Sequence, residues 1–270
     1  MMELSIILIT WNSDRFVKDC LDSVWRATEG MKREFILIDN NSTDTTRELL
    51  LPYINRPDVS FFPQTRNLGV AKARNIGLRQ AKGRFVWLLD IDTVANREAR
   101  EAMTEYMDTH DDCGLCGCKL VNSAGQVQDS CRRYPSFRFK MYNVLSSLLK
   151  KCKGADWMKS RIERLNESQF YHRQMKLSDA FEVEYIIGAC QFIRKKAIEQ
   201  VGLLDEHIFY GPEDADFCLR AGILGWKVCY LPSVSFIHEY QQITSKRLFS
   251  RMSWVHMKAL FYFFWKHKRI

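Results

Sequence analysis

The sequence has little of what marks several unusual protein classes. Only six of its 270 residues are proline and 13 are glycine, which excludes collagen-like and low-complexity chains. No apolar run approaches the roughly 20 residues that a membrane-spanning helix needs. The longest apolar run, residues 259–265, lies between lysines. Glu3 stands where a signal peptide would carry basic residues, and no small-residue cleavage site follows, so no secretory signal is expected.

Three motifs of common enzyme families are also missing. No G-x-G-x-x-G follows the first predicted strand, and no G-x-x-x-x-G-K-[ST] occurs. Dinucleotide dehydrogenases and P-loop enzymes therefore lose their best sequence support. The G-x-S-x-G turn that carries the nucleophile of α/β-hydrolases is absent as well.

Nine cysteines, an odd number, are scattered through apolar segments. Without a secretory signal they predict reduced, buried thiols and a cytoplasmic protein. Cys113, Cys116, Cys118 and Cys131 are spaced somewhat like a zinc site. Three of them fall within one predicted strand, whose alternate side chains point to opposite faces. Buried thiols are therefore favoured over a zinc site.

The chain is basic, with a formal net charge of +8, and the excess gathers at one end. Residues 244–270 contain seven lysines and arginines and no acidic residue. This balance predicts an anionic partner, such as nucleotide phosphates or an anionic membrane surface. No nucleic-acid-binding motif accompanies the basic residues, so a nucleic-acid partner is not expected.

Short apolar runs alternate with helical periodicity through the first 125 residues. The runs that predict strands are 4–9, 34–38, 59–62, 85–89 and 114–121. This alternation predicts an α/β fold, with a mostly parallel central sheet flanked by helices. Later strands are predicted at 185–193, 228–230 and 234–237, and later helices at 137–152, 195–201 and 245–267.

Polar residues follow three of the predicted strands, at 10–12, 39–42 and 90–92. Ligands of such sheets bind beyond the carboxyl ends of the strands, so we expect these clusters to converge on one site. Asp90 and Asp92 could both reach one hard cation, such as Mg²⁺ or Mn²⁺. The alternative is a solvated acidic loop.

Trp11 and Asp39 stand at two of these strand ends. Trp11 either belongs to the core or offers a platform on which a nucleotide base stacks. Asp39 either helps to start the next helix or accepts hydrogen bonds from the base or ribose of a nucleotide. The pattern alone leaves both alternatives open.

Two groups in the second half could also take part in chemistry. Glu213, Asp214 and Asp216 precede a predicted helix, where they either stabilise its positive end or supply a general base. Asp216 and Arg220 are spaced to pair on that helix. His238 ends a predicted strand, and it is either a structural residue or a further ligand of the metal site that Asp90 and Asp92 begin.

Taken together and in this order, the motifs resemble family 2 inverting glycosyltransferases of the GT-A fold. The resemblance covers roughly residues 3–240. Its second half is most similar to the rhamnosyltransferase-like branch, which builds bacterial surface polysaccharides. The matching segments are 5–12, 38–44, 67–69, 73–77, 89–92, 188–190, 201–206, 213–216 with Arg220, and His238.

The resemblance implies a role for each motif. The residues implied in nucleotide binding are Thr10, Trp11, Asp39, Asn67, Arg74 and Asp90. Those implied in binding Mn²⁺ or Mg²⁺ are Asp90, Asp92 and His238. Asp214 is the implied catalytic base, with Glu213 beside it, and the residues implied in acceptor binding are Gly188, Ala189 and Cys190.

The implied reaction transfers a sugar from a nucleoside-diphosphate sugar, of the dTDP-rhamnose or UDP-hexose type, to a hydroxyl of a saccharide or lipid-linked saccharide. The acceptor oxygen attacks opposite the leaving diphosphate, and one displacement inverts the anomeric carbon. Two other functions stay open on the residues alone: a nucleotidyltransferase, and a non-catalytic module that binds nucleotide sugars.

The expected catalytic domain spans residues 1–240. Its nucleotide-binding half is expected at 1–125, and its acceptor-binding half at 126–240, with a helical insert at about 136–180. Residues 241–270 are expected to form a basic amphipathic helix, which either packs on the domain or lies on an anionic membrane. The expected location is the cytoplasm, at the inner face of the cell membrane if this helix binds lipid.

Overall fold

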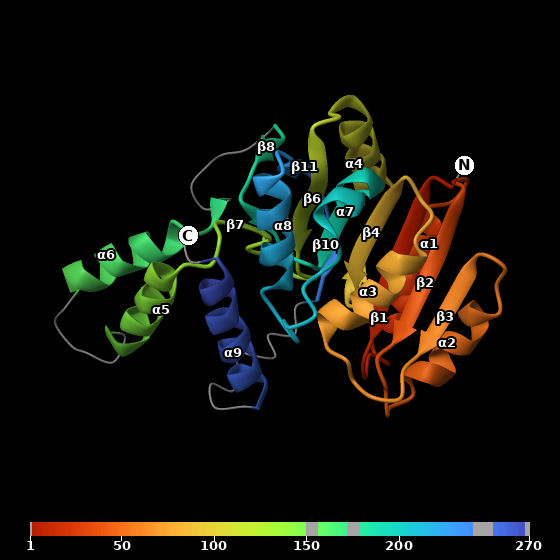
Figure 1. The fold of residues 1–270 in the computed structure, drawn as a ribbon, viewed down its shortest axis with the longest axis horizontal. Helices are drawn as coiled ribbons and strands as arrows, with labels where there is room; N and C mark the ends of the chain where they lie inside the picture. Colours follow the sequence, from red (N-terminus) through yellow and green to blue (C-terminus); the bar gives the residue numbers. More distant parts are fainter. Residues whose placement is uncertain (1, 150–155, 172–178, 240–250, 268–270) are drawn as a thin grey trace.

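The computed structural model describes residues 2–149, 156–171, 179–239 and 251–267 (Figure 1). One central sheet runs through the molecule, and helices cover both of its faces. The strand order is β3-β2-β1-β4-β10-β6-β11-β5, and β8 pairs with β11 off this path. The predicted α/β architecture is confirmed.

The first half contains the parallel part of the sheet. Its strands are β1 (Leu4–Thr10), β2 (Arg33–Asp39), β3 (Val59–Pro63) and β4 (Phe85–Asp90). The connecting helices are α1 (Val17–Ala27), α2 (Thr46–Ile54) and α3 (Val70–Gln80). Side chains of β1 and β4 are buried on both faces of the sheet, which explains why these strands read as continuous apolar runs.

The second half adds strands of both directions. β10 (Cys190–Arg194) runs antiparallel to β4 and to β6 (Cys113–Val121), and β6 pairs in parallel with β11 (Lys227–His238). The other elements are β5 (Thr93–Val94), α4 (Arg97–Thr109), β8 (Phe181–Glu182), α7 (Lys195–Val201) and α8 (Glu213–Ile223). A separate two-stranded sheet joins β7 (Cys131–Arg132) to β9 (Tyr185–Ile186).

The two strands predicted at 228–230 and 234–237 are a single strand, β11, so that prediction was wrong. The register of β11 against β6 shifts between Leu231 and Ser235. Pro232 lies within the shift, and proline has no N–H to give to the ladder. The residues that broke the sequence pattern therefore form an irregularity inside one strand.

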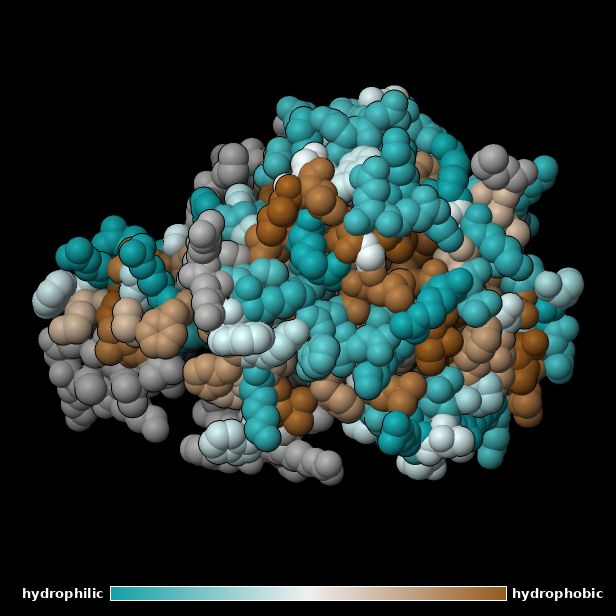
Figure 2. Space-filling model, in the orientation of Figure 1, coloured by the Kyte–Doolittle hydropathy of each residue, from teal (hydrophilic) through white to brown (hydrophobic). Residues whose placement is uncertain are grey.

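The core consists of two apolar layers, one on each face of the sheet. One layer contains side chains of α1, α2 and α4, and the other contains side chains of α3, α7 and α8. Polar side chains cover most of the surface in Figure 2, with apolar side chains exposed near the centre of that face. All eight cysteines that the structure describes are buried free thiols, as predicted; Cys152 lies outside the described residues.

Three helices stand beside this core: α5 (Phe137–Leu149), α6 (Asp156–Glu167) and α9 (Arg251–Lys266). Figure 1 shows α5 and α6 at the end of the molecule far from β3, with α9 next to α5. The part of the predicted C-terminal helix before residue 251 lies outside the described residues. No helix in the described part of the chain is long and apolar enough to cross a membrane.

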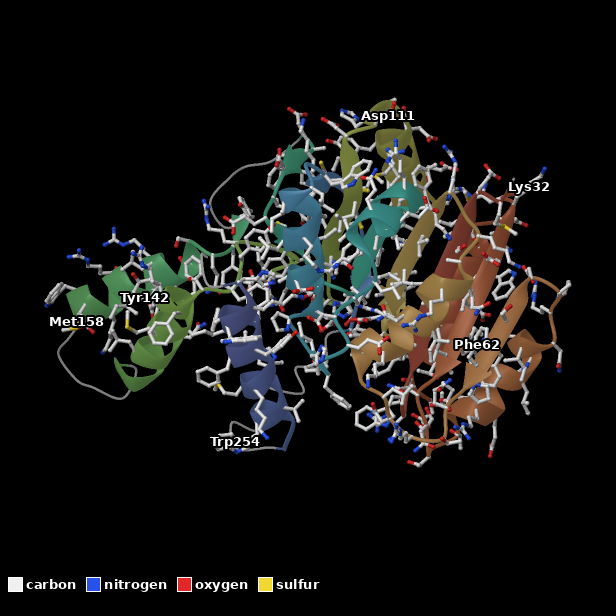
Figure 3. All side chains as sticks on the ribbon, viewed as in Figure 1. Lys32, Phe62, Asp111, Tyr142, Met158 and Trp254 are labelled. Atoms are coloured by element: carbon white, nitrogen blue, oxygen red, sulfur yellow. The ribbon has the colours of Figure 1, made fainter. Side chains whose placement is uncertain are left out.

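The helix α9 packs on the core through one apolar side and is tied down at its end. Leu260 and Phe263 are buried. Lys266 lies 2.6 Å from carboxylate oxygens of both Asp205 and Asp216, and His267 lies 2.8 Å from Asp216. The opposite side is exposed and apolar, with Trp254, Met257, Phe261 and Trp265. Figure 3 labels Trp254 near the start of α9, on the outside of the molecule.

Candidate active site

A cavity of about 460 Å³ opens beyond the carboxyl ends of β1 and β4. It is closed on the other side by the start of α8, the end of β11 and part of α9. Ten of the thirteen site residues predicted from the sequence line it: Trp11, Asn67, Arg74, Asp90, Asp92, Gly188, Ala189, Glu213, Asp214 and His238. Segments that are far apart in the sequence therefore line the same cavity.

Two carboxylates and an imidazole meet at the end of β4. Among the described residues, Asp90, Asp92 and His238 form the only group of three whose metal-ligating atoms all lie within 4.8 Å of one another. Burial raises the pKa of Asp92, as does the nearby charge of Asp90, although His238 acts in the opposite direction. Crowded oxygen and imidazole ligands fit a divalent cation such as Mn²⁺ or Mg²⁺.

Gln128 fixes the orientation of the His238 ring. Its side-chain nitrogen donates to the backbone oxygen of His238 at 2.6 Å, and its side-chain oxygen lies 2.7 Å from Nδ1 of the ring. The amide can satisfy both contacts only if Nδ1 carries a proton. Nε2 then faces Asp92, with Oδ1 at 3.3 Å. Gln128 was not predicted from the sequence, because 110 positions separate it from His238.

Arg74 of α3 connects the two sides of the cavity. One guanidinium nitrogen lies 2.6 Å from Asp90 Oδ1 and 2.7 Å from the backbone oxygen of Gly188. Another lies 3.9 Å from Glu213 Oε1. A Cβ atom at position 188 would collide with this guanidinium, so a larger residue there would displace the end of the Arg74 side chain.

Glu213 and Asp214 begin α8 at the far side of the cavity. Asp214 accepts hydrogen bonds from the backbone N–H groups of Gly188 (3.0 Å) and Ala215 (2.7 Å). Burial raises the pKa of Asp214. Burial, assisted by the charge of Asp214, also raises the pKa of Glu213 to about 7. A carboxylate whose pKa rises toward neutrality is a better proton acceptor at physiological pH.

Two buried polar atoms of this site have no hydrogen-bond partner within the part of the chain that the structure describes. They are Glu213 Oε2 and Arg74 Nε. Buried polar groups in folded proteins are nearly always hydrogen-bonded. Both residues line the cavity, so these atoms are suited to contact a bound ligand.

The other end of the cavity suits a nucleotide. The ring of Trp11 is 44% exposed, so it does not belong to the core and can stack on a base. Asn67 Oδ1 accepts from the Asn40 side chain at 3.0 Å and from the Gly69 N–H at 2.9 Å. These bonds hold the loop before α3 against the end of β2.

Three predicted site residues do not line the cavity: Thr10, Asp39 and Cys190. Asp39 is fully buried. Its carboxylate accepts from Thr10 Oγ1 at 3.0 Å and lies 2.5 Å from Arg47 Nε. The carboxylate thereby joins the ends of β1 and β2 to α2. Cys190 is buried in the core, with Trp87 Nε1 3.5 Å from its sulfur.

The cavity wall also includes residues that the sequence analysis did not single out. They are Arg132, Lys140, Tyr185, Tyr210, His256 and Leu260, among others. Arg132 comes from β7, Lys140 from α5, and His256 and Leu260 from α9. The basic character of the 137–152 segment and of the C-terminal segment was the available signal, but it did not say which side chains face inward.

Comparison with known proteins identifies the family. The family model for glycosyl transferase family 2 matches residues 5–202. A curated relative from Mycobacterium tuberculosis strain H37Rv is N-acetylglucosaminyl-diphospho-decaprenol L-rhamnosyltransferase. It is 27% identical over 273 residues, which cover 96% of this chain and 83% of the relative.

Two solved glycosyltransferases share the fold. The mannosyltransferase PcManGT from Pyrobaculum calidifontis, in complex with GDP-Man and Mn²⁺, has a TM-score of 0.59 at 17% identity and covers 89% of this chain. Staphylococcus aureus TarS 1-349, in complex with UDP-GlcNAc, has a TM-score of 0.58 at 20% identity and covers 91%. This chain spans 58% and 61% of those two chains.

The matched residues include the segments that approach the cavity from β1, β4, α3 and β10. A family match over most of the chain, together with the shared fold, favours a sugar transferase over the nucleotidyltransferase alternative. The chain belongs to glycosyl transferase family 2, and it is a glycosyltransferase with the GT-A fold.

Proposed function

We propose that the chain transfers a sugar, with inversion, from a nucleoside-diphosphate sugar to a hydroxyl of a saccharide acceptor, with the help of Mn²⁺ or Mg²⁺. The observation that carries this proposal is the shared cavity. The Asp90–Asp92–His238 cluster and the Glu213–Asp214 pair both line it, and Arg74 lies between Asp90 and Glu213. Such an arrangement separates stabilisation of the leaving group from activation of the acceptor.

The nucleotide-sugar donor is assigned to the end of the cavity that contains Trp11, Asn67 and Asp90. Trp11 stacks on the base, and Asn67 borders the ribose and phosphates. Thr10 and Asp39 support this end from below, because their hydrogen bond joins two adjacent strand ends. dTDP-rhamnose and UDP-hexoses are the proposed donors. The curated relative named as an L-rhamnosyltransferase supports the first.

Asp90, Asp92 and His238 are the residues that would hold the divalent cation. A bound cation supplies positive charge where the leaving diphosphate accumulates negative charge. Arg74 lies behind these three residues and donates a hydrogen bond to Asp90. Its buried cation adds to the positive charge facing the diphosphate.

Asp214 is the proposed base. Its two backbone hydrogen bonds fix the carboxylate, which leaves further lone pairs to accept the proton of an acceptor hydroxyl. The oxygen of that hydroxyl attacks the anomeric carbon from the face opposite the diphosphate. Glu213 Oε2, buried without a partner among the described residues, is proposed to accept a hydrogen bond from a sugar hydroxyl.

The acceptor is proposed to be a saccharide or a lipid-linked saccharide in surface polysaccharide synthesis. Gly188 and Ala189, which line the cavity, are proposed to border the acceptor, and the buried Cys190 supports them from the core. The backbone of Gly188 contacts both Arg74 and Asp214. The name of the mycobacterial relative includes a diphospho-decaprenol acceptor, which supports the lipid-linked class. In this proposal residues 1–125 bind the nucleotide and residues 126–240 bind the acceptor.

A lipid-linked acceptor would place the enzyme at the inner face of the cell membrane. The exposed side of α9 carries Trp254, Phe261 and Trp265 together with the exposed Lys258. Aromatic and basic side chains on one helix suit the surface of an anionic bilayer. We therefore propose that the protein is cytoplasmic and that it contacts the inner face of the cell membrane through α9.

The test is a thermal-shift panel of nucleoside-diphosphate sugars, with and without Mn²⁺, followed by a transfer assay. A donor that binds only the native state raises the melting temperature. We expect a metal-dependent shift with one donor class. We also expect a product whose anomeric configuration, read by NMR, is opposite to that of the donor. Retention of configuration, or binding without turnover on any saccharide acceptor, would contradict the proposal.

A further inference from the structure

Two cationic side chains and a histidine line the cavity on the side of Asp214. Arg132 lies on β7, Lys140 on α5 and His256 on α9. Nδ1 of His256 lies 3.3 Å and 3.2 Å from the backbone oxygens of Tyr210 and Gly211, just before the start of α8. Elements outside the nucleotide-binding half therefore supply these three side chains.

Lys140 stands out because its ammonium group has no acidic partner among the described residues. In the portions of the chain that the structure covers, no carboxylate or carbonyl group contacts its ammonium group. Burial, together with the charge of Arg132, lowers the pKa of Lys140. Burial, together with Lys140, likewise lowers the pKa of His256. Lys140 is thus close enough to both Arg132 and His256 for like charges to repel.

Arg132 is already oriented toward this space. Its Nε donates to the backbone oxygen of Asp129 at 2.6 Å, and its guanidinium lies 5.5 Å from the ring centroid of Phe170. These contacts fix the plane of the guanidinium. A fixed guanidinium beside an unmatched ammonium is suited to bind phosphate oxygens.

The donor diphosphate does not need these cations. It is assigned to Asp90, Asp92 and His238, which meet at the end of β4. Asp214 is itself an anion close to Arg132 and His256, whereas Lys140 has no acidic partner among the described residues, so the charge of Lys140 points to a second anion. Arg132 and His256 lie close to Asp214 in the same cavity, so a charged group on the sugar that presents its hydroxyl to Asp214 is within reach of these cations.

We propose that Arg132, Lys140 and His256 form a subsite for a phosphate or diphosphate group carried by the acceptor. This inference rests on the proposed function and deepens it, because it names the chemical class of the acceptor. The enzyme would then select an acceptor whose sugar is esterified to phosphate. Neutral sugars of the same structure would bind weakly.

The experiment compares two water-soluble acceptors that differ only in charge. One is an N-acetylglucosaminyl diphosphate with a short alkyl chain, and the other is the corresponding alkyl N-acetylglucosaminide. Calorimetry gives the Kd of each acceptor and of the nucleoside diphosphate, and a transfer assay gives kcat/KM. The variants are Lys140→Gln and Lys140→Arg. The control is Arg138→Gln, on the same helix but exposed and outside the cavity.

We expect Lys140→Gln to weaken binding of the diphosphate acceptor roughly tenfold or more, because a charge-assisted contact is lost. Its preference for the charged acceptor should fall by the same factor. Lys140→Arg should restore most of this preference, and Arg138→Gln should keep it. Binding of the nucleoside diphosphate should change by less than about twofold in all three variants.

Three results would overturn the inference. Equal Kd values of wild type and Lys140→Gln for the diphosphate acceptor would remove the subsite. Weaker binding of the nucleoside diphosphate alone would assign the cations to the donor. Loss of co-sedimentation with phosphatidylglycerol vesicles, with an unchanged acceptor Kd, would assign them to a lipid headgroup. Because calorimetry needs no turnover, failure of the transfer reaction would contradict only the proposed function.

Discussion

Asp214 is held by two backbone N–H groups at the edge of the cavity, and this geometry makes its replacement informative. Asp214→Asn keeps the shape of the side chain but removes the proton acceptor. We expect kcat to fall by about 10²–10⁴-fold, the usual contribution of a general base. The donor Kd, measured by calorimetry, should stay within about twofold of the wild-type value. Near-normal turnover would show that another group is the base.

Gln128 orients His238 and contacts no proposed substrate group, so its replacement should weaken the affinity for the metal. Gln128→Met removes both hydrogen bonds to His238 while keeping the length of the side chain. We expect the Kd for Mn²⁺ to rise about 10–100-fold, as for other residues that orient metal ligands. Calorimetry without donor measures this directly. The exposed Gln126, changed to Met, is the control and should leave the Kd unchanged.

Glu213 links stability to pH. Its pKa is raised from 4.5 to about 7, mainly by burial, so the folded state binds its proton more tightly than the unfolded state does. Stability should therefore fall as the pH rises from about 4.5 to 7. At ~1.4 kcal/mol per pKa unit, the loss is about 3 kcal/mol. Urea unfolding at several pH values should show this decline in the metal-free wild type. If Glu213→Gln declines as steeply, another group is responsible.

At the scale of elements, α9 offers a matched pair of phenylalanines. Phe263 is fully buried against the core, whereas Phe261 is 63% exposed on the same helix. Phe263→Ala should lower the free energy of unfolding by about 3–5 kcal/mol, because it leaves a cavity. Phe261→Ala should change it by less than about 1 kcal/mol. Chemical denaturation measures both values, and equal losses would mean that α9 does not pack as described.

Most elements could be predicted from the sequence because their signals are local. The apolar runs before Thr10, Asp39 and Asp90 each form a buried strand, and the carboxyl ends of parallel strands meet at one edge. That rule was enough to predict that Asp90 and Asp92 lie at the cavity. It could not show that Asp39 lies below the cavity wall, since burial depends on Arg47 from a neighbouring helix.

Long-range contacts account for the rest of what the sequence did not predict. Gln128 and His238 meet only because β6, which precedes Gln128, pairs with β11. Lys140 and His256 reach the cavity from two helices whose inward sides carry no distinctive pattern. Such contacts follow from how elements pack, and a single sequence carries no local signal for them.

For the whole molecule, the net charge of +8 and the exposed side of α9 predict binding to anionic vesicles. Changing Trp254, Phe261 and Trp265 together to Ser should reduce co-sedimentation with such vesicles by about tenfold or more. Changing Ile223 and Leu224, which are equally exposed at the end of α8, should not. Similar losses in both variants would indicate nonspecific hydrophobic binding rather than a specific face.

Arg74 gives the molecule a property that no single subsite has. The same guanidinium is bound to Asp90 beside the metal ligands and to Gly188, whose N–H holds Asp214. We expect a ligand that weakens or strengthens the contact between Asp90 and Arg74 to shift Gly188, and with it the carboxylate of Asp214. If the proposed donor and acceptor sites are right, we expect binding of the two substrates to be thermodynamically coupled, and such coupling is reciprocal: each substrate would alter the affinity for the other by the same factor, whichever binds first.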